Sequence, residues 1–322
     1  AQRVAEVHHA FGTALHAVQQ AVHQRQAAGA EVLAVTLRMR ACGEAAGGGA
    51  SPCGLDACAA AAAVAAQLGI PQRVIDARDR FDREVLRPCW EAFDAGRTPN
   101  PCVLCNARVK LPLLAEVADS LGGGRIATGH YVRTSVGADG VCRLCRGADP
   151  AKDQSYFLYA VAPCLLRRLT LPLGGLHKRE VREIAAARGL ANAGRPESQD
   201  ICFADEGDAP FAETLRRFLG AAARPGRLRH RDGRSLGAHT GVHQFTVGQR
   251  RGIGAFGPHP HFVAAIDAAT AEITLSDDPD DLLADACRAA ACVWHGDPPA
   301  PGSACRAQIR YRQHAVPATV LA

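Results

Sequence analysis

Short apolar runs and longer stretches of helical pattern alternate along the first two-thirds of the chain. Residues 31–38 (EVLAVTLR) are rich in Val and Leu and predict a buried strand, whereas residues 55–68 predict an alanine-rich helix that stops at Gly69 and Pro71. Further strands are expected at 73–76 and 125–128, and further helices at 79–93, with Asp79 as its cap, and at 103–121. This alternation is typical of an α/β fold with a parallel sheet and helices on both faces.

Ligands of such sheets bind beyond the carboxyl ends of the strands. The segments expected there are 36–39, 128–130 and the loop GRTPNPC at 96–102. We therefore look for chemistry in these three places.

The texture of the sequence changes after about residue 206, where long helical periods give way to turns and Gly, His, Thr and Val dominate. Residues 262–267 and 272–276 predict a hairpin, and residues 306–311 and 318–321 predict two further strands. We expect three domains: a Rossmann-like α/β domain over 1–205, a small, mainly β middle domain over 206–262, and an incomplete C-terminal β domain over 263–322. Because the sequence opens without Met and ends inside an apolar stretch, we expect it to be incomplete at one or both ends.

The composition excludes some classes of protein. The longest apolar run, 57–68, contains Gln67 and is shorter than the roughly 20 residues that cross a bilayer, so no membrane span is expected. The 322 residues include 13 cysteines, and no secretion signal is visible. We therefore expect a cytoplasmic protein whose cysteines are free thiols, metal ligands or catalytic groups.

Positive charge is concentrated in one stretch. The whole chain carries +5, whereas residues 210–251 hold nine arginines against Glu213 and Asp232. One interpretation is a solvated face in an arginine-rich protein. The other is a surface that contacts a phosphate backbone, and the local excess of charge favours it.

Two CxxC pairs raise the question of a four-thiolate zinc site. Cys142 and Cys145 lie in a predicted strand, where residues three apart point to opposite faces, so incidental cysteines are the better interpretation of that pair. Cys102 and Cys105 lie where a Pro-rich loop enters a helix, and helix N-termini lower thiol pKa values. By residue type alone they predict a redox or metal pair. Cys202 lies in a polar, accessible loop.

Six longer motifs then occur in a fixed order: GRTPNPCVLCNARVK (96–110), ATGHY (127–131), KDQSYFL (152–158), SQDICF (198–203), GVHQFTVGQRRGIG (241–254) and IRYR (309–312). A chain with these motifs resembles the tRNA-specific 2-thiouridylase family, which places sulfur on C2 of the wobble uridine of certain tRNAs. The likeness runs from about residue 29 to the C-terminus. It implies a HUP-type N-terminal domain and a truncated C-terminal β-barrel domain.

The resemblance also implies a mechanism. ATP with Mg²⁺ adenylates the uracil O2, and a sulfur-relay donor protein delivers a persulfide sulfur to the cysteine that matches Cys202. Cys105 matches a second cysteine, which helps to release the sulfur and leaves a Cys105–Cys202 disulfide. Thiolates and persulfides are strong nucleophiles near neutral pH, which suits this chemistry.

Matching residue by residue assigns the binding sites. The residues that border ATP are Gly12, Met39 and Gly129. The residues that contact tRNA are Asn100, Pro101, Cys102, His130, Lys152, Asp153, Gln154, Arg310 and Tyr311. Some have purely structural alternatives: His130 as a hydrogen-bond partner of a neighbouring loop, Lys152 and Asp153 as a first-turn pair of a helix, and Met39 as a core residue.

The sequence departs from the family in two places. The pyrophosphate loop Ser-Gly-Gly-x-Asp-Ser is replaced by residues 11–17 (FGTALHA), where only Gly12 corresponds and Leu15 takes the acidic position. This predicts weak ATP binding, either because the chain is a non-adenylating tRNA-binding paralogue or because its N-terminus is not the native one. In addition, Cys102 stands where part of the family has Asp, so Cys102, Cys105 and Cys202 form an alternative ligand set for a [4Fe–4S] cluster with one open iron.

Overall fold

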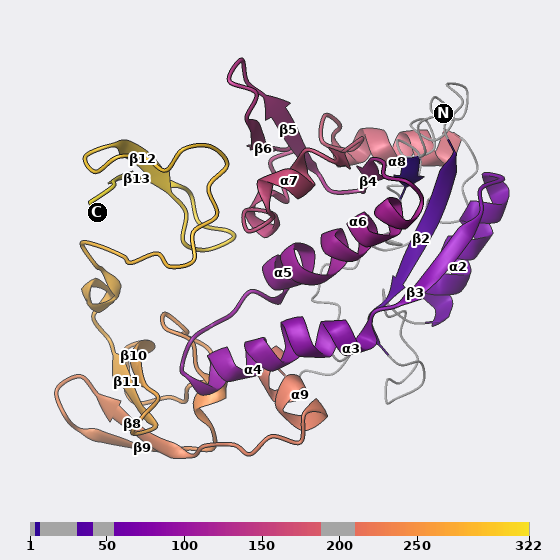
Figure 1. The fold of residues 1–322 in the computed structure, drawn as a ribbon. Coiled ribbons are helices and arrows are strands. Elements are labelled where there is room, and N and C mark those ends of the chain that lie inside the picture. The colour runs from indigo at the N-terminus through magenta and orange to yellow at the C-terminus, as the bar shows by residue number, and fades with distance from the viewer. Residues whose placement is uncertain (1–3, 7–30, 41–54, 188–209, 322) are drawn as a thin grey trace.

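The computed structural model describes residues 4–6, 31–40, 55–187 and 210–321. The N-terminal domain is built on a five-stranded sheet in the order β3-β2-β1-β4-β7, in which every neighbouring pair is parallel (Figure 1). The strands are β1 (Val4–Glu6), β2 (Val32–Arg38), β3 (Gln72–Asp76), β4 (Ile126–Ala127) and β7 (Leu169–Thr170). The predicted parallel sheet is confirmed.

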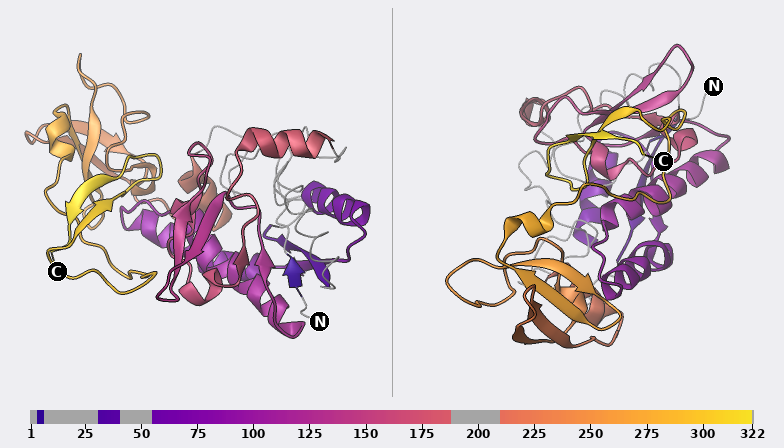
Figure 2. Two further views of the ribbon diagram at one scale, coloured as in Figure 1. Left: turned by 90° about the horizontal axis from the view of Figure 1, so that it is seen from above. Right: turned by 90° about the vertical axis from the view of Figure 1, so that its left-hand side faces the viewer.

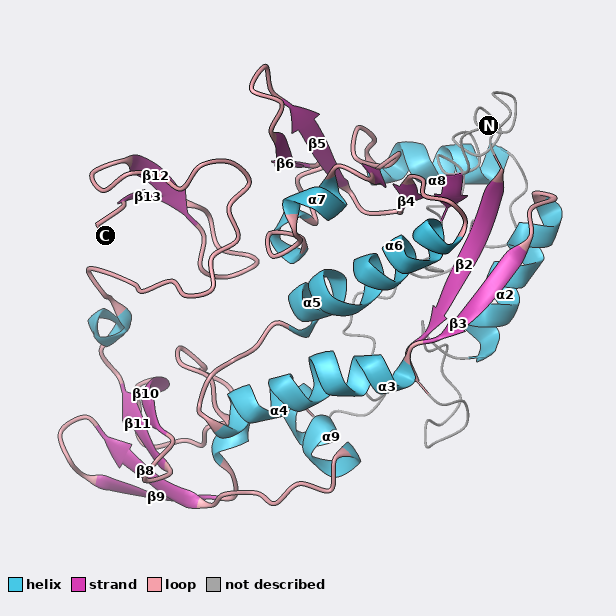
Figure 3. Cartoon of the chain, viewed as in Figure 1, coloured by secondary structure: helices cyan, strands magenta, loops and turns pink. Residues whose placement is uncertain are grey.

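Helices cover both faces of this sheet, and β2 shows why. Its residues Val32 and Ala34 pack with Val64 of α2 (Leu55–Gln67), whereas Val35 and Leu37 pack into the larger core. Successive side chains of a strand point to opposite faces, so a strand with apolar residues on both faces needs a cover on each side. Helix α8 (Lys178–Ala187) lies on the α2 side and α6 (Leu111–Ser120) on the other (Figure 3).

Two long helices carry the segments between β3 and β4. The first comprises α3 (Arg78–Phe81), a π-helical turn (Asp82–Leu86) and α4 (Arg87–Asp94). The second comprises α5 (Pro101–Leu104), a π-helical turn that begins at Cys105, and α6. The expectation that Asp79 caps the first helix is wrong: Ala77 holds the cap position, and Asp79 lies in the first turn.

A hairpin and a short helix complete this domain. Strands β5 (Val132–Val136) and β6 (Cys142–Arg146) pair antiparallel, and α7 is Pro163–Leu166. The buried Cys142 and the half-buried Cys145 belong to β6, as the strand assignment predicted, and Cys145 hydrogen-bonds to Ser135 at 3.3 Å.

The middle domain follows α9 (Phe211–Phe218) and consists of a four-stranded sheet in the order β10-β11-β8-β9. Its strands are β8 (Gly226–His230), β9 (Ser235–His239), β10 (Phe262–Asp267) and β11 (Glu272–Ser276). The predicted hairpin is confirmed as β10 and β11. A domain boundary after residue 262 would cut β10 from the sheet, and β11 pairs with β8, so we propose a division after Ser276 instead.

The C-terminal segment adds one antiparallel pair, β12 (Ala304–Ala307) and β13 (Val316–Thr319). Both strands begin two residues earlier than the sequence predicted. Residues 308–311 therefore form a loop, and hydrogen bonds join this loop to both other domains. In the left view of Figure 2, the yellow C-terminal segment lies beside the orange middle domain. Within the described residues, no helix has the length and hydropathy that a membrane span requires.

Candidate functional site

The entry into α5 places two thiols at a capped helix N-terminus. The Asn100 side chain accepts hydrogen bonds from the backbone N–H groups of Cys102 at 3.1 Å and Val103 at 3.3 Å, and Pro101 takes the first helical position. Cys102 is half-buried, and Cys105 is buried with 6% of its surface exposed. Residues three apart share one helix face, so both thiols face the same side of this helix.

A third thiol lies nearby. Cys89 of α4 is fully buried, and this burial raises the pKa of its thiol to about 12, with the negative charge of Cys102 adding to the effect. Cys89 has no local sequence motif, and the packing of the first long helix against α5, through the π-helical turn 82–86, brings the two helices together.

The middle domain holds the loop that leads into α5. Gly96 has a φ of +68°, and a Cβ atom at this position would lie 2.6 Å from Cγ2 of Ile266 on β10. Two residues further on, the Thr98 hydroxyl donates a hydrogen bond to Oγ1 of Thr246 at 3.0 Å. The position of the thiol-bearing helix is therefore set from two domains.

The carboxyl end of β4 carries the segment 128–130. Oγ1 of the buried Thr128 hydrogen-bonds to Nδ1 of the half-buried His130 at 2.8 Å, and Gly129 between them is exposed. Met39, just beyond β2, is 3% exposed and belongs to the main core, which agrees with its structural interpretation. Contact of any of these residues with a nucleotide or with tRNA remains a prediction.

Side chains of the turn formed by Lys152, Asp153 and Gln154 hydrogen-bond to the backbone of neighbouring segments. Asp153 is 9% exposed, and its carboxylate accepts hydrogen bonds from the backbone N–H groups of Gly147 at 2.9 Å and Ser155 at 3.1 Å. Gln154 accepts one from the backbone N–H of Tyr131 at 2.9 Å. Asp153 and Gln154 thus position backbone, and the half-buried Lys152 is the cation that the turn presents.

The C-terminal loop meets the residues that follow this turn. The ring centroid of Tyr311 lies 4.4 Å from that of Phe157, and the Tyr156 hydroxyl donates to the Ile309 carbonyl at 3.1 Å. Phe157 in turn accepts a hydrogen bond on its carbonyl from the Asn106 side chain at 3.2 Å, one residue past Cys105. Tyr311 is therefore linked through Phe157 to the thiol-bearing helix.

Arg310 lies in the same loop and donates from Nη2 to the Val247 carbonyl of the middle domain at 2.9 Å. The structure thus gathers predicted site residues from three distant motifs: 100–105, 152–154 and 310–311. Gly12 and Cys202 lie outside the described residues.

Most of the arginines in the basic stretch are neutralised by acids. Ion pairs join Arg224 to Asp94 at 2.7 Å and Arg231 to Asp281 at 2.7 Å. Four more arginines of the stretch form ion pairs: Arg216 and Arg217 with Glu213, Arg229 with Glu272, and Arg234 with Asp232. In the described part of the chain, three exposed arginines of the stretch have no ion pair: Arg227, Arg250 and Arg251.

The positions of the cysteines, histidines and acidic residues show which side chains could bind a metal ion together. No thiolate cluster is present among the described residues, whose one candidate group of metal ligands is His230, His261 and Asp277. The four-thiolate zinc site is thus absent from the part that the structure describes. Exposed Gly129, without a Cβ at the carboxyl edge of a parallel sheet, fits the approach of an adenine nucleotide.

Fold and site together define a protein of the HUP class with a β domain and with two cysteines at the start of a long helix. Residues 17–206 match the family model described as the tRNA methyl transferase HUP domain, and residues 212–277 match the tRNA methyl transferase PRC-barrel domain.

Relatives with high sequence identity define the family more closely. A tRNA-specific 2-thiouridylase MnmA of Geobacter metallireducens is 42% identical over 268 residues, which cover 83% of this chain and 72% of the relative. A protein of the same name from Rhizorhabdus wittichii is 46% identical over 250 residues, with coverage of 77% and 66%. The chain belongs to the tRNA-specific 2-thiouridylase family.

Solved structures give a more distant likeness. The U34-tRNA thiolase NcsA from Methanococcus maripaludis with its [4Fe-4S] cluster has a TM-score of 0.39 and 16% identity, over 68% of this chain and 65% of that one. A likeness at this level carries no argument about function.

Proposed function

We propose that this chain transfers sulfur to C2 of the wobble uridine of tRNA, at the expense of ATP. The observation that carries the proposal is the capped helix N-terminus that presents Cys102 and Cys105 in a chain of this family. The same helix is hydrogen-bonded through Asn106 to Phe157, three residues after the turn 152–154. The residues come from separate motifs and meet at one place. We place the reaction in the cytoplasm, where thiols stay reduced.

ATP and Mg²⁺ belong to this proposal. ATP supplies the adenylyl group that turns the uracil O2 into a leaving group. Gly129 and Met39 border the nucleotide at the carboxyl ends of β4 and β2, and Gly12 is the remaining glycine of the pyrophosphate loop. The exposed backbone at Gly129 supports this assignment, because it leaves room for a ligand.

The chain's own thiols perform the sulfur step. A sulfur-relay donor protein leaves a persulfide on Cys202, and the Cys105 thiolate attacks the Cys202 sulfur. The S–S bond of the persulfide breaks and hydrosulfide is released to attack C2, from which AMP departs. The Cys105–Cys202 disulfide that forms is reopened by a thiol reductant. Asn100 contributes by fixing the helix N-terminus, whose N–H groups favour a thiolate.

The tRNA is held by residues around these thiols. Lys152 and Arg310 supply positive charge for phosphates, and Tyr311, 39% exposed, supplies a ring on which a base can stack. Asn100, Pro101 and Cys102 face the target base, which must leave its stack to be reached. The contact set is completed by His130, Asp153 and Gln154.

The test compares cysteine variants in a thiolation assay that counts 2-thiouridine in tRNA by mass spectrometry. Cys105→Ser and Cys202→Ser are expected to abolish the product while tRNA binding persists in a gel-shift assay. The control is Cys164→Ser, which changes an exposed cysteine of α7 and should retain the activity. Undiminished thiolation by either of the first two variants would show that the assigned roles are wrong.

A second mechanism is favoured by one observation: Cys102 and Cys105 share a helix face, as two ligands of a [4Fe–4S] cluster would. With Cys202 they would hold the cluster and leave one iron open for sulfur. Chemical analysis of protein purified without oxygen decides between the mechanisms, since iron and acid-labile sulfide are expected only for the cluster. An ATP titration tests the remaining alternative, a paralogue that binds tRNA without adenylating it.

A further inference from the structure

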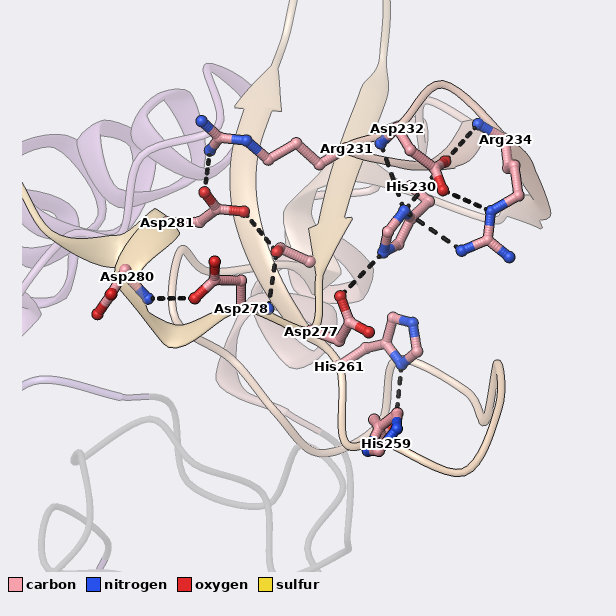
Figure 4. A network of polar contacts seen from close by, with 11 residues as sticks. His230, Arg231, Asp232, Arg234, His259, His261, Asp277, Asp278, Asp280 and Asp281 are labelled. Carbon is pink, nitrogen blue, oxygen red and sulfur yellow. Dashed lines mark hydrogen bonds and ion pairs between the residues drawn. The ribbon is translucent and has the colours of Figure 1, made fainter.

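Two histidines and a carboxylate converge at one end of the middle-domain sheet. His230 is the last residue of β8, His261 precedes β10, and Asp277 follows β11. The register explains their meeting, because β8 runs parallel to β11 with His230 opposite Leu275, and β10 runs antiparallel to it with Phe262 opposite Ser276. Their ligand atoms all lie within 4.8 Å of one another (Figure 4).

The distances suit a small divalent ion. Nε2 of His230 lies 3.3 Å from Oδ1 of Asp277. A tetrahedral ion with bonds of about 2.0–2.1 Å needs ligand atoms about 3.3–3.4 Å apart, so this edge already has the required length. The His261 ring lies edge-on to His230, with 5.6 Å between the centroids. Because the ligand atoms lie within 4.8 Å of one another, the distances to His261 need to shorten by at most about 1.5 Å to complete the triangle.

Partners on the far side of each imidazole orient the ligands. Nδ1 of His230 lies 3.0 Å from a carboxylate oxygen of Asp232, and Nδ1 of His261 lies 3.0 Å from the His259 carbonyl. With a proton on its Nδ1, His261 donates to the His259 carbonyl and keeps the Nε2 lone pair for a metal. Nδ1 of His230 accepts a hydrogen bond from the backbone N–H of Asp232 at 3.3 Å, so His230 offers its Nε2 lone pair in the other tautomer, which the nearby Asp232 carboxylate favours. Carboxylate–histidine–metal and carbonyl–histidine–metal arrangements are the usual outer contacts of zinc ligands.

Burial supports the same interpretation. Both histidines are 8% exposed, whereas Asp277 is exposed and leaves the position open to solvent. Two imidazoles and one carboxylate form the ligand set of several zinc sites that keep a fourth position for water.

We propose that His230, His261 and Asp277 bind one Zn²⁺ ion, with water as the fourth ligand. The ion joins the ends of β8 and β11 to the segment before β10. It lies in the middle domain and uses none of the cysteines to which sulfur transfer is assigned, so the site is independent of that activity.

Metal titration of the full chain tests the site. Because the 13 cysteines also bind zinc, the measured quantity is the difference between wild type and a His230→Gln/His261→Gln variant after chelator treatment. The double variant is expected to bind one Zn²⁺ fewer per chain in equilibrium dialysis, whereas the control His314→Gln, at an exposed histidine, keeps the full number. Equal numbers in wild type and double variant would overturn the proposal.

Two further measurements separate the site from thiols and from unfolding. With Co²⁺, the difference spectrum should show visible bands of a four-coordinate ion without thiolate charge transfer, and thiolate absorption in it would refute the ligand set. Asp277→Asn changes an exposed side chain and Asp232→Asn an outer partner, so both should leave the fold intact. Asp232→Asn should weaken Zn²⁺ binding about 10- to 100-fold, and Asp277→Asn should weaken it at least as much. Unchanged affinity in both variants is incompatible with the site.

Discussion

The contact between Gly96 and Ile266 predicts that a single methyl group disturbs the reactive loop from the middle domain. In Gly96→Ala the new Cβ would lie 2.6 Å from Cγ2 of Ile266, 3.4 Å from its Cβ and 3.5 Å from Cβ of Ala268. Ile266 is branched at Cβ and has few other rotamers, so backbone must move instead. Gly96 also has a φ of +68°, which a residue with a Cβ adopts at a cost of about 1 kcal/mol.

The magnitude follows from the two effects together. Overpacking costs about 1–3 kcal/mol and adds to the backbone cost, so Gly96→Ala should lower the free energy of unfolding by about 2–4 kcal/mol. The matched control is Gly69→Ala: its φ is +64°, and no atom lies within 4 Å of the added Cβ. The control should therefore lose only about 1 kcal/mol.

Urea unfolding followed by tryptophan fluorescence measures these losses. Trp90 in α4 is the reporter, because its ring centroid lies 5.4 Å from that of His243 in the middle domain. In the double variant Gly96→Ala/Ile266→Ala the clash is relieved, so the Gly96 substitution should cost about as much there as the substitution of Gly69. Thiolation should fall about 10- to 100-fold in Gly96→Ala, because displacements near 1 Å have such effects, and partly return in the double variant. Equal losses at Gly96 and Gly69, or no recovery, would refute the reasoning.

Two further predictions concern the middle domain. Hydrogen bonds from Arg216 and then His243 hold the pKa of Glu213 well below its usual range. The stabilising effect of this carboxylate is therefore present above pH ~4.3 and fades as the pH falls towards the folded-state pKa. In acid unfolding, Glu213→Gln should be less stable than wild type at neutral pH and should lose less stability than wild type below about pH 5. Arg250→Ala should lower the slope of log tRNA affinity against log salt concentration by about 1, measured by filter binding. Arg229→Ala should leave this slope nearly unchanged, because Arg229 forms an ion pair with Glu272. Equal effects of the two variants would contradict the conclusion that ion-paired arginines do not bind phosphates.

The regular elements of the N-terminal domain could be predicted because local sequence determines them. Residues 32–37 are apolar at all but one position, and such a run is typical of a strand covered on both faces. The helix expected to begin at residue 103 begins two residues earlier, where Asn100 caps it and Pro101 takes the first helical position.

Features that depend on distant partners were not predictable. The net charge of residues 210–251 includes only the acids within that stretch of sequence. In the structure, Arg224 and Arg231 are neutralised by Asp94 and Asp281, which lie outside it. Cys89 belongs to no sequence motif, and the burial that raises the pKa of its thiol, together with the charge of Cys102, arises only in the folded protein. The strand expected to include Tyr311 ends earlier, because Tyr311 packs against Phe157 instead.

The same non-local principle governs the middle domain. His230, His261 and Asp277 have no spacing that matches a metal motif, and only the strand register of the sheet unites them. The domain boundary that we propose also depends on distant pairing, because the pairing of β11 with β8 extends the middle-domain sheet past residue 262 to Ser276.

The central position of β1 in the parallel sheet has a consequence for biosynthesis. β1 pairs with β2 and with β4, and β4 follows it only after α2, β3 and both long helices have been made. Contacts between segments so far apart in sequence form slowly, whereas β2 pairs with β3 through a single helical connection. On the ribosome, the edge of β1 that faces away from β2 therefore stays unpaired until β4 emerges, and during this interval the nascent chain is open to wrong strand pairing.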